Sequence, residues 1–141
     1  MRGTLQCLLE FWRKLLRREA PLTRGAHAGR TRSWTAESGY VYEYSFAGFR
    51  RVRRSGESFI EYQFSVSASR SEPRVVAVFL PEERLPEWTG TAREITASER
   101  YGIAKLCLNQ EFDRAEAPPL LMKELNPDRA QILEVAQTLD L

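Results

Sequence analysis

Residues 40–68, which read YVYEYSFAGFRRVRRSGESFIEYQFSVSA, decide the fold. On both sides of Ser55-Gly56, large apolar side chains recur at every second position, which is the period of a strand with one buried face. The residues that share this face are Tyr40, Tyr42, Tyr44 and Phe46 before the turn, and Ile60, Tyr62, Phe64, Val66 and Ala68 after it. The stretch therefore predicts a long antiparallel hairpin that closes on a tight Ser-Gly turn.

The register of this hairpin predicts a bulge at Gly48. Closing the turn on Ser55-Gly56 aligns Phe49 with Tyr62 on the apolar face. Continued unchanged, the same pairing would place Tyr44 opposite a serine of the solvent face. One extra residue near Gly48 restores the aromatic pairs, and glycine within a strand is where a bulge is expected.

The rest of the chain predicts one α+β domain over residues 38–141. Residues 73–81 (PRVVAVFLP) indicate a third strand that is apolar on both faces. Thr96-x-x-Glu99 is a capping box that begins a helix, and Asn126 is the expected N-cap of a final amphipathic helix. We expect a three-stranded antiparallel sheet, made of the long bulged hairpin plus the third strand, covered by the C-terminal helices.

Residues 1–19 predict a basic amphipathic helix, and residues 20–37, which lack periodicity, predict a flexible linker. Leucines and aromatic side chains form one stripe of the helix, and cations crowd its last turns, a pattern typical of interfacial helices. The expected contact residues are Leu8, Phe11, Trp12, Leu15, Leu16, Arg13, Lys14, Arg17 and Arg18. The stripe equally fits an anionic membrane surface, a partner protein or the sheet of its own domain.

Charge is distributed unevenly along the chain. Residues 1–35 contain eight Arg and Lys against two Glu, a net charge of +6, whereas the remainder has 13 basic and 17 acidic side chains, a net charge of −4. A basic amino-terminal arm on a mildly acidic body indicates an anionic partner for the arm.

The hairpin tip carries Arg50, Arg51, Arg53 and Arg54, which raises the alternative of a nucleic-acid contact. The expected register places Arg50 opposite Glu61 and Arg54 opposite Glu57, so that cross-strand ion pairs occupy two of the four. A solvated hairpin tip is therefore the favoured interpretation, and nucleic-acid binding through these arginines and the basic arm is the alternative.

No motif in the sequence indicates catalysis, a metal or a cofactor. The single histidine, His27, lies in the expected linker, where a general base would lack fixed geometry, and we interpret it as an incidental surface side chain. Cys7 and Cys107 have no partners at metal-ligand spacing, which favours free cysteines in a reducing compartment. An enzyme whose site forms only in three dimensions stays open as a further alternative.

These patterns together predict a non-catalytic interaction or adaptor module of bacterial style. We expect a cytoplasmic protein without cofactors, bound through its first helix to a protein partner or peripherally to the inner, anionic face of a membrane. Homo-oligomerisation stays open, and no small-molecule substrate is evident.

Overall fold

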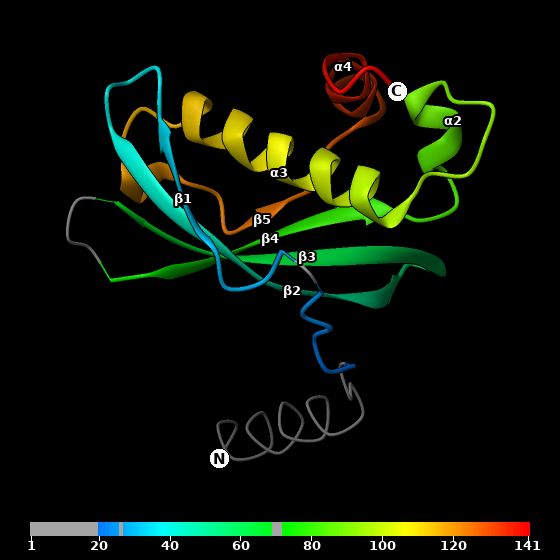
Figure 1. The fold of residues 1–141 in the computed structure, drawn as a ribbon, viewed down its shortest axis with the longest axis horizontal. Helices are drawn as coiled ribbons and strands as arrows, with labels where there is room; N and C mark the ends of the chain where they lie inside the picture. The colour runs from blue at the N-terminus through cyan, green and yellow to red at the C-terminus, as the bar shows by residue number, and fades with distance from the viewer. Residues whose placement is uncertain (1–19, 26, 69–71) are drawn as a thin grey trace, which may run out of the picture.

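The computed structural model describes residues 20–25, 27–68 and 72–141, and shows an α+β fold with a five-stranded mixed sheet. Helices lie on one side of the sheet (Figure 1). The elements in chain order are β1 (Thr31–Thr35), β2 (Val41–Arg54), β3 (Glu57–Ala68), β4 (Arg74–Pro81), α2 (Leu85–Thr89), α3 (Ala97–Arg114), the short 3₁₀ helix η1 (Pro118–Leu120), β5 (Glu124–Leu125) and α4 (Arg129–Thr138).

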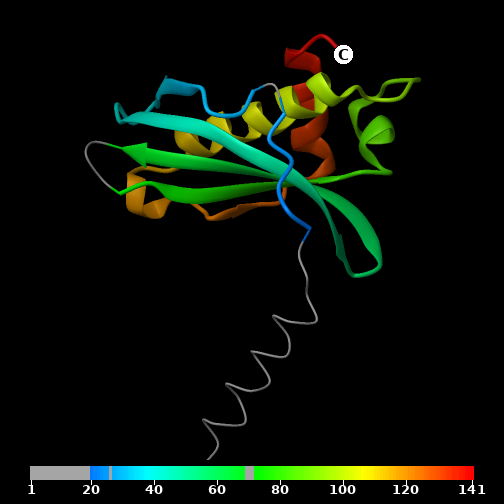
Figure 2. The same ribbon diagram turned by 60° about the horizontal axis from the view of Figure 1, so that its bottom comes forward.

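The long hairpin and its bulge are confirmed. β2 and β3 pair with Phe49 opposite Tyr62 and Phe46 opposite Phe64, and the register shifts between Phe46 and Gly48. The tip of this hairpin extends beyond the other strands (Figure 2). Ser55 and Gly56 both have positive φ, of 52° and 76°, as the turn that best matches the twist of paired strands requires.

The expectation of three strands is wrong, because β1 and β5 add to the sheet. β1 lies inside the stretch expected to be a linker and pairs antiparallel with the start of β2, and β5 pairs parallel with β4 through two residues. The strand β1 has one large apolar side chain, Trp34, which donates a hydrogen bond to Asp113 of α3 at 3.0 Å. An edge strand held in this way needs no alternating apolar pattern, and β5 is too short to show one.

The core lies between the aromatic face of the sheet and the helices. Tyr42 stacks on Phe112 of α3 with ring centroids 4.4 Å apart, and Phe46 meets Tyr101 edge-on at 5.0 Å. Tyr42, Phe112 and Ile132 of α4 are fully buried. Each buried aromatic ring removes on the order of 150–250 Å² from water, so this interface is the main source of stability.

The helix starts agree in part with the sequence. The capping box at Thr96 is confirmed, since its side chain accepts from Glu99 N and the Glu99 side chain accepts from Thr96 N. The expected N-cap Asn126 is wrong by two positions, because Asp128 accepts from Gln131 N instead. Both residues can cap a helix, and only the fold decides which one has the extended backbone that a cap needs.

The residues before β1 run along the free edge of β2. Thr23 exchanges two backbone hydrogen bonds with Phe49, of 2.7 and 2.9 Å, and Ala28 forms a bridge with Phe46. Gly48 is essential at this crossing, since a Cβ there would lie 2.9 Å from the carbonyl oxygen of Thr23. The chain is therefore held against the sheet from about Thr23 onward.

Candidate functional site

The contact residues expected in the first helix lie outside the described residues. They are Leu8, Phe11, Trp12, Leu15, Leu16, Arg13, Lys14, Arg17 and Arg18. What the structure describes is the attachment of the chain that follows, where Thr23 is hydrogen-bonded to Phe49. At most three residues, Ala20 to Leu22, separate the predicted helix from this attachment, so a surface that binds the helix lies close to the body.

The hairpin arginines contact neighbouring side chains and backbone of their own chain. Arg50 forms an ion pair with the buried Glu61, and Arg51 donates to both oxygens of Glu82. Arg53 donates to the carbonyl oxygen of Gly56. Arg54 lies 3.6 Å over the centre of the Phe79 ring and forms an ion pair with Glu124.

These contacts reduce the capacity of the hairpin to hold phosphates. A backbone phosphate would have to displace Glu61 or Glu82 from its arginine. Glu82 is held firmly enough that the hydrogen bonds from Arg51 lower the pKa of its carboxyl group below its ordinary value. The two arginines that the expected register leaves without a cross-strand acid, Arg51 and Arg53, thus have partners in the fold.

Cations that form no ion pair among the described residues lie instead near Tyr101 of α3. We call these the cationic cluster, and they are Arg32, Arg100 and Lys105. Among the described residues, none of the ion pairs includes any of the three. Glu82, whose carboxyl group is influenced by the charge of Arg100, is bound to Arg51, and Glu99 is bound to Arg93.

Two pKa shifts report the concentration of positive charge in the cationic cluster. Burial, and then the positive charge of Arg32, lower the pKa of Lys105 below its ordinary value. The positive charge of Arg32 also opposes the rise in pKa that burial imposes on the Tyr101 hydroxyl. Burial therefore disfavours the charged form of Lys105, and the charge of Arg32 disfavours it further.

His27 is not an incidental surface side chain. Its ring stacks on Tyr101 with centroids 4.1 Å apart and planes 2° from parallel. Beside the stack lies a pocket of about 160 Å³, lined by Gly25, His27, Phe46, Phe49, Tyr62, Ala97, Ser98, Arg100 and Tyr101. Bridges at Thr23 and Ala28 pair the chain with β2 on both sides of the histidine, where the sequence predicts a flexible linker.

Arg100 supplies the charge in this pocket. Its guanidinium donates to the Ile95 carbonyl oxygen at 2.9 Å and hydrogen-bonds to the Tyr62 hydroxyl. Its Nε is buried, and within the described residues it has no acceptor. A buried N–H group without an acceptor is uncommon because its desolvation is left uncompensated.

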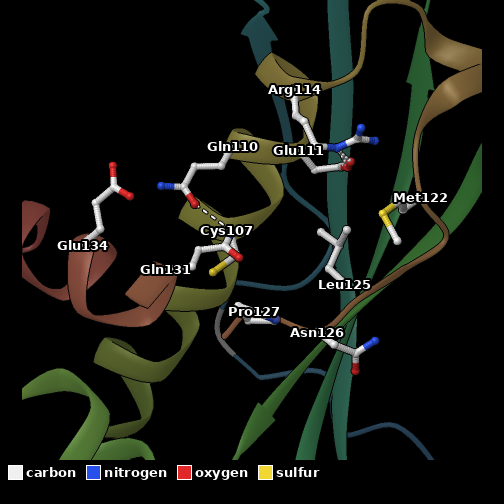
Figure 3. A pocket seen from close by; sticks show the side chains of 10 residues that line it. All are labelled: Cys107, Gln110, Glu111, Arg114, Met122, Leu125, Asn126, Pro127, Gln131 and Glu134. Carbon is white, nitrogen blue, oxygen red and sulfur yellow. Dashed lines mark hydrogen bonds and ion pairs between the residues drawn. The ribbon is translucent and has the colours of Figure 1, made fainter. Parts of the chain in front are cut away.

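A second, larger pocket of about 460 Å³ lies between α3 and the β5–α4 connection (Figure 3). Its polar groups are largely paired with each other. Arg114 contacts the buried Glu111 on one side, and Gln131 donates to Gln110 at 2.7 Å on the other. Cys107 lies in the lining, but burial raises the pKa of its thiol to about 12, so the thiolate needed for nucleophilic chemistry does not form at neutral pH.

Sequence reasoning missed the cationic cluster and the pocket beside His27. Their residues come from the segment before β1, from β1, from the hairpin and from the first half of α3, and only the fold brings these together. No spacing along the chain signals them. Over residues 20–25, 27–68 and 72–141, no group of three or more His, Cys, Asp or Glu side chains could hold a metal ion, and no helix is long and apolar enough to cross a membrane.

No protein-family model, curated protein or solved structure matches this chain.

Proposed function

We propose that this chain is a non-catalytic interaction module that docks on an anionic membrane surface. The basic helix predicted over residues 1–19 supplies one contact, and the cationic cluster of the body supplies a second. A single interfacial anchor binds a membrane weakly and reversibly, whereas an anchor combined with a basic patch binds stably.

The observation that supports this proposal most is the position of the cationic cluster. Gly25 and His27 line the same pocket as Arg100, and Thr23 pairs with Phe49, which also lines it. The cluster therefore lies beside the segment that leads out of the predicted helix. A surface bound by that helix is within reach of the cluster, and no long linker separates the two.

The test is co-sedimentation of the full-length protein with neutral phosphatidylcholine vesicles and with vesicles that also contain phosphatidylglycerol. We expect binding to the anionic vesicles alone, and weaker binding at physiological than at low salt. Arg32→Gln combined with Lys105→Gln removes two cluster cations. At about 1 kcal/mol per cation near an anionic surface, binding weakens roughly 30-fold.

Arg74→Gln combined with Lys123→Gln is the matched control. These two cations line one shallow hollow at the β4–β5 edge, so the variant loses the same charge from another part of the body. If both variants weaken vesicle binding equally, the cluster contributes only through the net charge of the protein, and its proposed role as a second membrane contact is refuted. If the protein binds single-stranded nucleic acid and does not bind vesicles, the cluster binds nucleic acid and the membrane proposal is wrong. If the protein binds neither, the membrane proposal is also wrong, and a protein partner for the predicted helix is favoured.

A further inference from the structure

We propose that the pocket beside His27, at the start of α3, binds a phosphomonoester group. The pocket shares Arg100 with the cationic cluster, so the inference deepens the proposed function by naming the chemical group that this face recognises. It does not require the membrane, because a soluble phosphorylated molecule presents the same group.

The size of the pocket selects a small group. Its volume of about 160 Å³ corresponds to roughly five water molecules at about 30 Å³ each. Sites for drug-sized ligands begin at about 300 Å³. A terminal phosphate fits, whereas a whole nucleotide would leave its base and sugar outside.

The lining offers hydrogen-bond donors that no described group uses. The buried Nε of Arg100 has no acceptor among the described residues. The backbone N–H groups of Ala97 and Ser98 are the first two of α3, where the capping box occupies only the N–H of Glu99. Donors at the start of a helix suit an anion, and the Ser98 hydroxyl adds another.

The charges at the pocket favour an anion. Arg100 lines it, Arg32 interacts with the Tyr101 hydroxyl, and neither cation forms an ion pair among the described residues. The acid that interacts with Arg100 and the acid of the helix start are both bound to other arginines. Glu82 is held by Arg51, and Glu99 is held by Arg93. A phosphomonoester carries close to two negative charges and three acceptor oxygens, which match these donors better than a diester with one charge and two free oxygens.

The aromatic walls strengthen such contacts. Phe46, Phe49, Tyr62 and Tyr101 exclude water from one side of the pocket. Hydrogen bonds between a guanidinium group and an anion are stronger where the local dielectric is low. His27 closes the pocket from the segment before β1, so occupancy also holds that segment against α3.

The first experiment is an NMR titration of the full-length protein with inorganic phosphate, against sodium chloride at equal ionic strength. We expect saturable shifts of the amide signals of Ser98 and Arg100 and of the His27 ring. Ser98→Glu places a carboxylate at the pocket and should weaken phosphate binding by at least tenfold. The fold should tolerate it, because acidic residues in the first turn stabilise a helix.

Ala130→Glu is the matched control, since Ala130 is exposed and holds the same second position of α4. It should leave phosphate binding unchanged. Arg100→Gln, checked by circular dichroism for folding, should also weaken binding at least tenfold. Shifts that do not saturate, or that persist equally in Ser98→Glu and Ala130→Glu, would overturn the proposal.

A vesicle comparison separates the two sources of phosphate. Phosphatidic acid presents a monoester and phosphatidylglycerol a diester, and vesicles are matched in total charge. If the protein prefers phosphatidic acid vesicles and Ser98→Glu abolishes this preference, the pocket binds a lipid headgroup. If the protein binds phosphate in solution but shows no such preference, the pocket binds a soluble phosphorylated molecule. If the protein binds phosphate but no vesicles, the proposed membrane function is refuted and the phosphate site is supported. If the protein binds vesicles but phosphate causes no shifts, the phosphate site is refuted and the membrane function is supported.

Discussion

Gly48→Ala tests the link between the bulge and the segment that precedes β1. Gly48 has φ of +149°, a conformation that side chains with a Cβ rarely adopt and that costs about 1–3 kcal/mol. The new Cβ would also lie 2.9 Å from the backbone oxygen of Thr23 and 3.0 Å from the Leu22 Cβ. Overpacking of this kind adds about 1–3 kcal/mol, so we expect a loss of between about 2 and 6 kcal/mol in the free energy of unfolding.

Gly56→Ala is the control for the backbone term alone. Gly56 also has positive φ, of +76°, but a Cβ there would meet nothing within 4 Å. Its expected cost is only about 1–2 kcal/mol. The difference between the two variants, measured by urea unfolding followed by circular dichroism, therefore reports the contact with residues 22 and 23 together with the difference between the two backbone costs.

Hydrogen exchange gives a local readout of the same contact. If the added methyl group displaces the segment, the amide protons of Thr23 and Phe49 exchange faster in Gly48→Ala than in Gly56→Ala, because each donates to the other residue. Equal costs of unfolding in both variants, together with unchanged protection of Thr23, would refute the argument that the bulge holds this segment in place.

Three further predictions concern single side chains. Tyr42→Phe should leave stability unchanged or raise it by about 1 kcal/mol, because its buried hydroxyl has no partner among the described residues. Tyr44→Phe should lower it by about 1 kcal/mol, because the Asn109 side chain interacts with that hydroxyl and lowers its pKa against the effect of burial. Thermal unfolding compares the two variants. The pKa of Glu99 is lowered from 4.5 to about 2, chiefly by its hydrogen bonds from an arginine, so its contribution is complete above about pH 4.5 and is lost as the pH falls toward 2. Stability measured over that interval should fall less steeply in Glu99→Gln, and equal slopes would contradict this. The last prediction uses a variant in which the other cysteine, Cys7, is replaced by serine. Because Cys107 is only 1% exposed, its thiol should react with a thiol reagent no faster than the protein unfolds. Rapid labelling of the native protein would be inconsistent with this burial.

The hairpin could be predicted residue by residue because its apolar period admits one register. Shifting that pairing by one position would have moved Tyr44 and Phe46 to the solvent face, so the bulge at Gly48 followed from the pattern alone. The edge strand β1 could not be predicted, because Trp34 is its only large apolar side chain and backbone pairing holds it to β2.

The candidate site depended on long-range contacts that no local pattern records. His27 looked isolated between alanines, and its ring partner Tyr101 lies 74 positions further along the chain. The hairpin arginines are four within five positions, which suggested an anion-binding patch, yet most of them pair within the fold. The cations of the cluster are spread singly along the sequence, and only the packing of α3 against the β2 edge gathers them.

The parallel pairing of β5 has a consequence for the order in which the molecule is assembled. Strands β1 to β4 pair with their neighbours in sequence, so each can form as soon as the next one has been synthesised. β5 must wait for α2 and α3 to cross the sheet before Lys123 can accept from Ala77, and α4 follows only after that. The aromatic face of a nascent chain therefore stays uncovered until α3 has been made and partly uncovered until α4 follows, and during this interval the chain depends most on protection from aggregation.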